Sequence, residues 1–371
     1  KFLKSFASEK RKTTKARIIA ITGSAGKTSL KNLLGNLLQS FDHTFKSPKS
    51  FNNYLGVPLS LSQLKIKHKY GVFEIGMSKS GEINKLSKLI QPNIAIITNV
   101  GEAHLENFKN LKGIAKAKGE IINNIREDGT IILNRDDKYF KYLEKKAKSK
   151  NINIVTFGMK KKSDVFLIKI IKIKKNKILK IKIQNQILYI EAASINIYNI
   201  LSSLAVFKIL NFDLNKLTKF FKNQEPSDGR GKIHNIKRYG KNFKLIDESY
   251  NANPLSVKNA INNFTSIKKQ KFKKYLLLGD MLELGKKSEF FHKNLSKVIN
   301  NSDIDKVFIK GNKTLNTYKC LNVNKRGNIF QQEEDVDFIL NNIISNNDYL
   351  MIKGSNATGL NNLTKKIIKG N

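Results

Sequence analysis

Short apolar runs and amphipathic stretches alternate along the first third of the chain. Strands buried in a parallel sheet form short continuous apolar runs, whereas an amphipathic helix repeats its apolar positions every three or four residues. The predicted strands are residues 18–21, 70–75, 94–100 and 130–133, and the predicted helices are residues 29–38, 83–90 and 111–125. This alternation predicts an α/β domain whose sheet is mainly parallel and covered by helices on both faces.

The pattern changes between residues 165 and 190, where lysine alternates with isoleucine or leucine. Alternation with a period of two is typical of antiparallel hairpin strands with one solvated face, so we expect a small antiparallel section there. The clearest stretches of this kind are residues 170–174 and 177–183, and a helix is predicted over residues 195–210.

The segment from Gln224 to Gly231 is the densest cluster of turn-forming residues in the chain, and we place a domain boundary there. Strand and helix signals alternate again after it, with strands predicted at residues 244–246, 275–278, 306–309 and 349–352. We therefore predict a central domain over residues 18–225 and a second α/β domain over residues 226–371. The basic stretch of residues 1–17 is too short for a domain, and we interpret it as a remnant or linker.

The composition narrows the class of protein. Of the 371 residues, 40% are hydrophobic and 26% are charged, which suits a globular chain of two or three domains and excludes a disordered one. Cys320 is the only cysteine, so neither an intrachain disulfide nor a cysteine-based metal cluster can form. No apolar run reaches the roughly eighteen residues of a membrane span. We therefore expect no membrane span and a cytoplasmic location.

The charge balance raises the question of a nucleic-acid partner, because basic residues outnumber acidic ones by 69 to 29. However, only seven of the basic residues are arginine, the side chain best suited to bind bases and phosphates through two hydrogen bonds. The lysines are spread along the whole chain beside abundant Ile and Asn, which favours an AT-rich coding bias. A polyanion-binding face and an acidic-lipid surface are the alternatives. We expect no specific nucleic-acid partner.

A glycine-rich turn follows the first predicted strand and opens the first predicted helix. Its backbone N–H groups could surround a phosphate, Lys27 would contact the outer phosphates, and Thr28 would place its hydroxyl on Mg²⁺. Ile21 stands where the full P-loop pattern has a glycine, so only a shorter form is present, and a plain turn before a helix is the alternative. The predicted nucleotide-binding residues are Thr22, Gly23, Ser24, Ala25, Gly26, Lys27, Thr28 and Ser29.

Two further side chains follow predicted parallel strands. Glu74 ends the second strand and His104 follows the third. The carboxyl ends of parallel strands are where ligands bind in open α/β sheets, so we predict that both side chains hold a metal ion. A surface carboxylate is the alternative for Glu74, and a capping or packing role is the alternative for His104.

Six further motifs occur in order along the chain, at residues 51–59, 104–108, 115–120, 247–254, 279–285 and 353–355. With the phosphate loop, Glu74 and His104, they resemble the Mur ligases, the ATP-dependent amide-forming enzymes of peptidoglycan precursor synthesis. The resemblance extends from residue 18 to about residue 360 and is strongest to the branch that adds D-alanyl-D-alanine. It implies a P-loop-containing central domain followed by a Rossmann-like domain.

The resemblance implies roles for the residues around the phosphate loop. Lys27 and Thr28 would hold the ATP phosphates and a first Mg²⁺, and Glu74 would complete the shell of that ion. His104 would bind a second Mg²⁺. Lys118 matches a position that carries a carbamate in the family, which turns a cation into a metal-bridging anion. Lys116 is the competing candidate, and a plain surface lysine is the alternative.

The resemblance also implies nucleotide and substrate contacts further along the chain. Asn134 and Asp137 are similar to contacts on the adenine and ribose side, and Arg230 is similar to an arginine that reaches the ATP phosphates. The remaining nucleotide contacts would be Asp247 and Asn251, and the substrate contacts would be Asn52, Asn53, Tyr250 and Asn253. A plain turn is the alternative for residues 251–254.

The chain departs from the family pattern at three places. Asn356 and Asn361 stand where an arginine and an acid are expected, which brings the dipeptide contacts at these positions into question. A glycine-x-histidine-asparagine stretch is Ala193-Ser194-Ile195-Asn196 here and keeps only the asparagine. The family's amino-terminal domain binds the uridine nucleotide, and we expect no counterpart of this domain in this chain.

These expectations describe an ATP- and Mg²⁺-dependent ligase, acting as a monomer. It would join D-alanyl-D-alanine to UDP-N-acetylmuramoyl-tripeptide through an acyl phosphate. A related ligase of the diaminopimelate-adding or folylpolyglutamate type is the first alternative, and residues 250–254 and 279–285 argue against it. A lysine-rich nucleic-acid-binding NTPase is the second alternative.

Overall fold

The computed structural model describes residues 2–173, 176–191, 195–268, 271–330 and 334–370. The chain forms two compact units. Unit 1 consists of Lys1–Gly101 and Asn107–Glu225, and unit 2 consists of Glu102–Glu106 and Pro226–Asn371. Each unit has its own sheet and its own hydrophobic core.

The described part of unit 1 contains a nine-stranded sheet in the order β2-β3-β1-β4-β5-β6-β7-β8-β9. The strands are β1 Arg17–Thr22, β2 Thr44–Lys46, β3 Tyr70–Glu74, β4 Ile94–Ile97, β5 Thr130–Asn134, β6 Asn153–Gly158, β7 Val165–Ile173, β8 Asn176–Ile183 and β9 Gln186–Glu191. Neighbouring strands are parallel as far as β7, and β7, β8 and β9 pair antiparallel. The predicted α/β class, with a mainly parallel sheet and a small antiparallel section, is confirmed.

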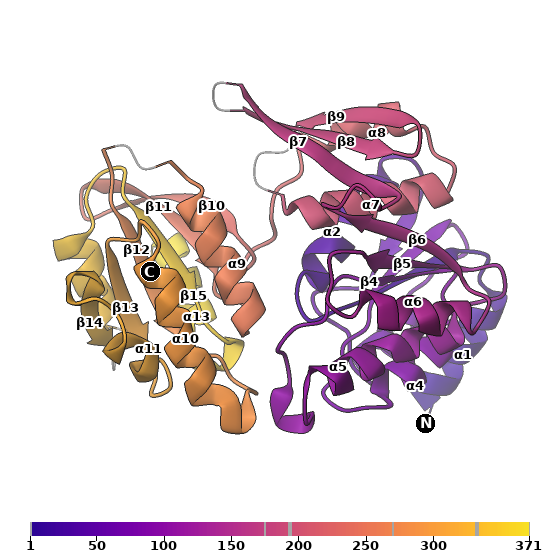
Figure 1. Ribbon diagram of the computed structural model, residues 1–371, viewed down its shortest axis with the longest axis horizontal. Coiled ribbons are helices and arrows are strands. Elements are labelled where there is room, and N and C mark those ends of the chain that lie inside the picture. The colour runs from indigo at the N-terminus through magenta and orange to yellow at the C-terminus, as the bar shows by residue number, and fades with distance from the viewer. Residues whose placement is uncertain (1, 174–175, 192–194, 269–270, 331–333, 371) are drawn as a thin grey trace. The chain divides into compact units, whose positions relative to one another are not determined.

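Helices lie on both faces of this sheet (Figure 1). They are α1 Phe2–Thr13, α2 Lys27–Gln39, α3 Gly56–Ser62, α4 Glu82–Ile90, α5 Leu111–Lys118, α6 Phe140–Lys148, α7 Ile197–Ile209 and α8 Leu214–Phe221, with 3-10 turns at Leu105–Asn107 and Gly119–Asn124. One buried cluster joins Ile19 and Ile21 of β1 to leucines of α2 and to Leu201 and Leu204 of α7. The parallel strands are buried on both faces, which explains their continuous apolar runs.

Several boundaries differ from the sequence prediction for a physical reason. Strand β4 ends at Ile97 rather than at residue 100, because the polar residues after it turn away to bond the phosphate loop. Helix α5 ends at Lys118, and its continuation to residue 124 is a 3-10 turn. Helix α1 was not predicted, and Arg11 anchors it through hydrogen bonds to the carbonyls of Ile90 and Gln91.

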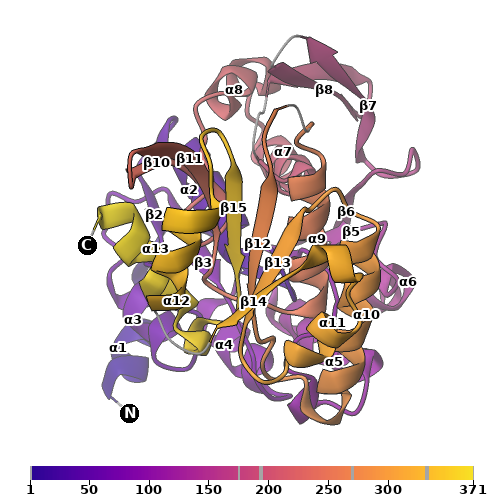
Figure 2. The same ribbon diagram turned by 90° about the vertical axis from the view of Figure 1, so that its left-hand side faces the viewer.

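The described part of unit 2 contains a six-stranded sheet in the order β10-β11-β15-β12-β13-β14 (Figure 2). The strands are β10 Lys232–Arg238, β11 Lys241–Glu248, β12 Lys274–Gly279, β13 Lys306–Lys310, β14 Arg326–Phe330 and β15 Tyr349–Lys353. The helices are α9 Pro254–Thr265, α10 Ser288–Asn300, α11 Leu315–Lys319, α12 Glu334–Phe338 and α13 Leu360–Lys369. Only β10 and β11 pair antiparallel, so β11, β15 and β12 end at the same edge of the sheet.

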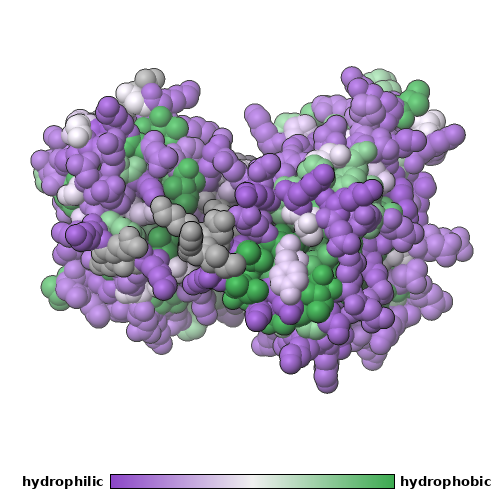
Figure 3. All heavy atoms as spheres, turned by 90° about the horizontal axis from the view of Figure 1, so that it is seen from above, coloured by the Kyte–Doolittle hydropathy of each residue, from purple (hydrophilic) through white to green (hydrophobic). Residues whose placement is uncertain are grey.

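Hydrophilic side chains cover most of the face shown in Figure 3. In β9 the burial alternates, with Leu188 and Ile190 buried while Ile187 and Tyr189 are exposed.

Residue 174, at the end of one predicted alternating stretch, lies outside the described residues. Within the part of the chain that the structure describes, no helix has the length and apolar character needed to cross a membrane.

Candidate functional site

The phosphate loop lies between β1 and α2, as its sequence predicted. Gly26, the residue before α2, has a φ of 82°, and Gly23 has a φ of 151°. A side chain at Gly23 would also place its Cβ 1.9 Å from Thr98 Oγ1. Both glycines are therefore needed for the backbone to follow this path. Helix α2 begins directly after the loop and adds the positive end of its dipole.

The segment after β4 holds the phosphate loop in place. Asn99 accepts a hydrogen bond of 2.9 Å from the Ala25 N–H and donates one of 3.1 Å to the Ala25 carbonyl. Thr98 Oγ1 donates to the same carbonyl at 2.7 Å. Ser24 Oγ donates to the Gly101 carbonyl at 2.8 Å and accepts from the Gly101 N–H at 2.9 Å. The sequence prediction missed Thr98 and Asn99 as site residues, because it assigned residues 94–100 to a strand.

Lys27 and Thr28, the first residues of α2, lie at the same end of the helix. Lys27 Nζ donates to the Gly23 carbonyl at 2.9 Å, so the ammonium group lies back across the loop. The buried hydroxyl of Thr28 donates to Glu74 Oε2 at 2.6 Å. Ser29, the next residue, is half-buried. The structure therefore brings together the predicted phosphate lysine, the predicted metal hydroxyl and the predicted metal carboxylate.

Glu74 lies at the carboxyl end of β3 and is 1% exposed. Its second oxygen, Oε1, accepts a hydrogen bond of 2.7 Å from Asn52 Nδ2, while Ser50 Oγ lies 3.3 Å from Thr28 Oγ1. Asn53 is exposed and accepts from the backbone N–H groups of Leu55 and Gly56 at the start of α3. Asn52 thus contacts the metal carboxylate, whereas the Asn53 side-chain oxygen shapes the adjacent turn.

The donor atoms of this cluster suit Mg²⁺. A hydroxyl and a carboxylate are hard oxygen ligands, and Mg²⁺ usually takes one or two carboxylates together with waters and substrate phosphates. Among the residues that the structure describes, no group of three or more His, Cys, Asp and Glu side chains is placed to hold a metal ion. A magnesium ion at Thr28 and Glu74 would therefore need the phosphate oxygens that the adjacent loop is shaped to bind.

Lys118, the last residue of α5, is buried, whereas the competing candidate Lys116 is exposed. Burial, and after it the nearby charge of Lys27, lower the pKa of Lys118 well below its usual value, and the charge of Asp137 acts in the opposite direction. A lowered pKa increases the fraction of neutral amine, which is the form that reacts with CO₂ to give a carbamate. The geometry favours Lys118 over Lys116 for such a modification.

Asn134 and Asp137 follow β5, and both hold the backbone after β4. Asn134 Nδ2 donates to the Thr98 carbonyl at 3.1 Å, and Asp137 Oδ2 accepts from the Val100 N–H at 2.7 Å. Burial raises the pKa of Asp137, while hydrogen bonds from the N–H groups of Tyr139 and Val100 lower it. These two predicted nucleotide contacts thus also support the segment that holds the phosphate loop.

Asp136, which the sequence prediction did not single out, lies between them. Its Oδ2 accepts from the Tyr198 hydroxyl at 3.1 Å and from the Met159 N–H at 2.5 Å. Its Oδ1 is buried and has no hydrogen-bond partner among the described residues. Burial, then the charge of Asp136, raise the pKa of Tyr198 to about 12. Asn196, the residue of the departing stretch that matches the family pattern, caps α7, and residues 193 and 194 lie outside the described residues.

In unit 2, the predicted residues gather at the carboxyl edge of the sheet. The guanidinium of Arg230 lies 4.6 Å from the centre of the Tyr250 ring. Asp247 is buried and accepts hydrogen bonds from the Gly229 N–H at 2.6 Å and from Ser249 Oγ at 2.6 Å. Asp247 therefore holds the turn that carries Arg230 against the end of β11.

The stretch after β11 is held by Lys353, at the end of β15. Lys353 Nζ donates to the Asn251 carbonyl at 2.7 Å and lies 3.2 Å from Glu248 Oε2. Burial lowers the pKa of Lys353, and the charge of Glu248 acts against that effect. Asn253 caps α9 through a reciprocal pair of bonds with Ser256, and the Asn251 side chain accepts from the Ala252 N–H. Both asparagine side chains therefore have a local structural role.

Two of the departures from the family pattern, Asn356 and Asn361, lie in unit 2. Asn356 is exposed. Asn361 is buried, and its Nδ2 donates to Ser249 Oγ at 3.1 Å. An acid at position 361 could not donate this hydrogen bond in its ionised form.

His104 belongs to unit 2 by its contacts, together with residues 102–106. Its φ is +57°, and its Nδ1 lies 2.6 Å from Glu283 Oε2. A hydrogen bond from His104 holds the pKa of Glu283 below its usual value. The sequence prediction assigned His104 to a second Mg²⁺, and in the structure its side chain contacts a carboxylate from the motif at residues 279–285.

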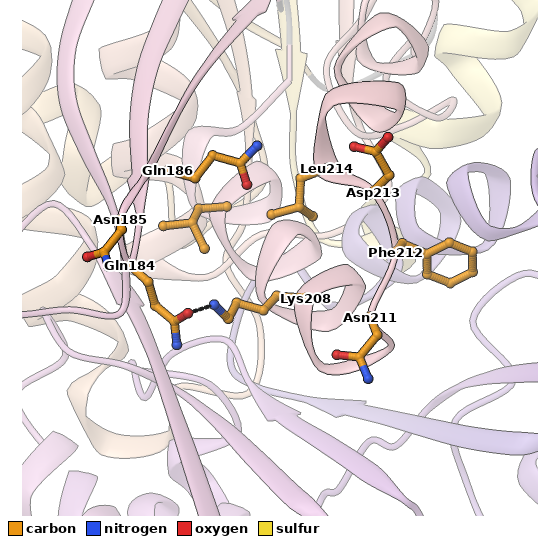
Figure 4. A pocket seen from close by; sticks show the side chains of 9 residues that line it. Gln184, Asn185, Gln186, Lys208, Asn211, Phe212, Asp213 and Leu214 are labelled. Atoms are coloured by element: carbon orange, nitrogen blue, oxygen red, sulfur yellow. Dashed lines mark hydrogen bonds between the residues drawn. The ribbon is translucent and has the colours of Figure 1, made fainter.

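A separate pocket of unit 1 lies between the β8–β9 turn and the loop before α8 (Figure 4). Gln184, Asn185 and Gln186 line one side of it, and Lys208 and Asp213 are on the other. Lys208 Nζ donates to Gln184 Oε1 across it. None of the predicted site residues lines this pocket.

The sheet order, the glycine-rich turn after β1 and the carboxylate at the end of β3 define an α/β enzyme of the P-loop nucleotide-binding class. A model of the Mur ligase middle domain matches residues 21–207, and a model of the Mur ligase glutamate ligase domain matches residues 231–356. The chain therefore belongs to the Mur ligase family.

Relatives and solved structures agree with this assignment. A UDP-N-acetylmuramoyl-tripeptide–D-alanyl-D-alanine ligase of Buchnera aphidicola subsp. Acyrthosiphon pisum is 34% identical, over 97% of this chain and 78% of the relative. The crystal structure I of MurF from Acinetobacter baumannii covers 99% of this chain and 80% of its own, with 26% identity and a TM-score of 0.88. The MurF ligase of Thermotoga maritima in complex with ADP covers 99% of this chain and 83% of its own, with 25% identity and a TM-score of 0.86.

Proposed function

We propose that this ATP-dependent ligase joins D-alanyl-D-alanine to UDP-N-acetylmuramoyl-tripeptide in peptidoglycan precursor synthesis. The observation that carries the chemistry is the pair of Thr28 and Glu74 directly beside the phosphate loop. The choice of substrates rests on relatives named for this reaction, one of them 34% identical over 97% of the chain. A diaminopimelate-adding or folate-type ligase, and a nucleic-acid-binding NTPase, have no comparable support.

The reaction has two steps whose atoms balance. An oxygen of the tripeptide's terminal carboxylate attacks the γ-phosphorus of ATP. A bond forms between this oxygen and the phosphorus, the bond from the γ-phosphorus to the oxygen of ADP breaks, and ADP leaves. The amine of D-alanyl-D-alanine then attacks the carbonyl carbon of this acyl phosphate. An amide forms, inorganic phosphate leaves, and the amine loses a proton. Most of the work of the protein in such transfers is positioning and charge stabilisation.

Different residues of unit 1 would provide this positioning and charge stabilisation. The backbone of residues 23–26 would surround the phosphates, and Lys27 would neutralise charge on the outer ones. Thr28 and Glu74 would hold Mg²⁺, which supplies Lewis-acid stabilisation of the phosphoryl oxygens when bound. Asn52 would orient the Glu74 carboxylate. Asn134 and Asp137 would contact the nucleoside and, through residues 98–100, would hold the phosphate loop.

Two further assignments rest on the family resemblance and on local support. A carbamate on Lys118 is favoured by the burial of its amine. Nucleotide and dipeptide contacts by Arg230, Asp247, Tyr250, Asn251 and Asn253 are favoured by their common position at one edge of the unit 2 sheet. The binding of a second Mg²⁺ by His104 and action as a monomer stay predictions from the sequence. Because the reaction consumes ATP, we place it in the cytoplasm.

The test is phosphate release by the full-length protein with ATP and Mg²⁺. UDP-N-acetylmuramoyl-tripeptide and D-alanyl-D-alanine are supplied separately and together, with single amino acids as amine controls. Release that requires both substrates is the expected result. Release with UDP-N-acetylmuramoyl-tripeptide and a different amine would assign the protein to another branch of the family. Release that ignores both substrates and rises with DNA or RNA would contradict the proposal.

A further inference from the structure

Lys31, one helical turn after Lys27 on α2, has a side chain that is 0% exposed and that the reaction described above does not use. Lysine is almost never fully buried unless strong hydrogen bonds satisfy its charge. Lys31 Nζ donates to the Ser47 carbonyl at 2.7 Å and also to the Lys49 carbonyl. This buried cation therefore ties α2 to the segment that follows β2.

The backbone of this segment is shaped to meet α2. Lys49 has a φ of +43°, a left-handed conformation that is unfavourable for a residue with a side chain. The carbonyl of this strained residue is one of the two that accept from Lys31. One turn further along α2, a Cβ at Gly35 would lie 2.8 Å from Lys46 Cδ. Lys31 and Gly35, on successive turns of α2, thus both favour close approach of residues 46–49 to the helix.

The same segment carries the groups that contact the metal pair. Ser50 Oγ lies 3.3 Å from Thr28 Oγ1, and Asn52 Nδ2 donates to Glu74 Oε1 at 2.7 Å. Ser47 Oγ accepts from the Glu74 N–H at 3.3 Å, and the Asn52 carbonyl accepts from the Gly76 N–H at 2.8 Å. The carbonyls that Lys31 binds are therefore within a few residues of the side chain that orients Glu74.

We propose that Lys31 is a positioning residue for the magnesium side of the site. It holds residues 47–52 against α2, so that Asn52 orients the Glu74 carboxylate toward the ion that Thr28 also binds. Lys27 and Lys31 then have different roles on one helix face, since Lys27 binds phosphate and Lys31 binds backbone carbonyls. This inference rests on the proposed function only in taking Thr28 and Glu74 as Mg²⁺ ligands.

The test compares Lys31→Met with Lys274→Met in the full-length protein. Lys274 is a matched control in unit 2, because its side chain is also 0% exposed and its Nζ donates to the carbonyls of Phe264 and Ile267. Its ion pair with Asp303 makes its removal at least as costly to folding. The readouts are the Mg²⁺ concentration for half-maximal phosphate release at saturating ATP, and the thermal midpoint.

Lys31→Met is expected to raise the half-maximal Mg²⁺ concentration about tenfold, which corresponds to about 1.4 kcal/mol, because the loss of its charge-assisted hydrogen bonds releases residues 47–52 from α2. High Mg²⁺ should restore part of the rate. Lys274→Met should lower the thermal midpoint and leave the Mg²⁺ dependence within about twofold. If Lys31→Met does not fold, Lys31→Gln is judged by the same criterion.

An unchanged Mg²⁺ dependence in a folded Lys31 variant, or an equal change in Lys274→Met, overturns the proposal. It is also overturned if neither Lys31 variant folds while Lys274→Met does, because the role of Lys31 is then in folding alone. These results are separate from the test of function, since the wild-type protein either requires both substrates for phosphate release or does not.

Discussion

The hydroxyl of Thr28 and the carboxylate of Glu74 are 2.6 Å apart, although 46 positions separate them in the chain. β1 and β3 are neighbouring parallel strands, so the residue after the loop of one meets the last residue of the other. We predict that Glu74→Gln lowers kcat by about 100-fold or more, because an amide is a weaker ligand for Mg²⁺ than a carboxylate. Phosphate release over a series of Mg²⁺ concentrations measures the effect.

The control for Glu74→Gln is Glu127→Gln, the same change at an exposed position of unit 1. It should leave the rate and the Mg²⁺ dependence unchanged. Glu74→Gln with a normal rate at low Mg²⁺ would show that Glu74 does not bind the ion.

Lys27→Ala is expected to abolish ADP formation, with a loss of about 1,000-fold or more, because the lysine neutralises charge on the transferred phosphoryl group. Lys85→Ala, at an exposed position of α4, is the matched control and should retain full activity. ADP production in a coupled assay decides between them. Full turnover by Lys27→Ala would contradict the assignment of the phosphate loop.

Asn99→Asp should raise the KM for ATP about tenfold. The aspartate keeps the acceptor for the Ala25 N–H, but it loses the donor to the Ala25 carbonyl, and such a hydrogen bond contributes about 0.5 to 1.5 kcal/mol. It also places a negative charge beside the phosphate loop. Asn123→Asp adds the same charge at an exposed position and should leave the KM unchanged. Equal KM values for all three proteins would contradict the role of Asn99.

Carbamylation of Lys118 predicts a dependence on CO₂. Activity should fall when the protein is kept in CO₂-free buffer and recover when bicarbonate is added, and ¹³C-bicarbonate should give a carbamate signal in the NMR spectrum. Lys118→Met should lose both the activity and the signal. Lys116→Met, at the exposed position on the same helix, should keep both. A carbamate signal that survives in Lys118→Met would place the modification elsewhere.

His292 predicts a pH-dependent stability of unit 2. Its buried Nε2 accepts from the Met281 N–H at 3.1 Å, and burial lowers the pKa of His292 below the usual 6.5. The unfolded chain therefore binds a proton at higher pH than the folded chain, so stability falls as the pH drops below about 6.5. His292→Gln should weaken this dependence.

The measurement is the thermal midpoint as a function of pH, compared with that of His43→Gln. His43 is exposed in unit 1, so its replacement should keep the wild-type slope between about pH 7.5 and about pH 5.5. Identical slopes for wild type and His292→Gln would show that other groups cause the acid sensitivity.

The elements with the strongest periodic signals were predictable from the sequence. β1, β3 and β5 and helices α2 and α4 agree with the predicted ranges to within about two residues, because buried parallel strands and amphipathic helices have distinct periods. The edge strands β2, β10 and β14 were missed, because each has at most one buried residue and so no apolar pattern along it. The end of β4 was placed three residues too late, since Thr98 and Asn99 bond the phosphate loop instead of the sheet.

The class of the protein could be predicted from its sequence, as could the position of the glycine-rich loop and of Thr28 and Glu74 beside it. This was possible because a glycine-rich turn after one parallel strand and a carboxylate at the end of the next are local patterns, and parallel strands bring their carboxyl ends to one edge. The folded chain was needed to show that Lys118 is buried and Lys116 exposed, that Asn99 holds Ala25, and that Lys31 binds the carbonyls of Ser47 and Lys49. Those outcomes depend on how deeply each helix packs and which distant backbone groups it meets, and no local pattern of residues encodes either.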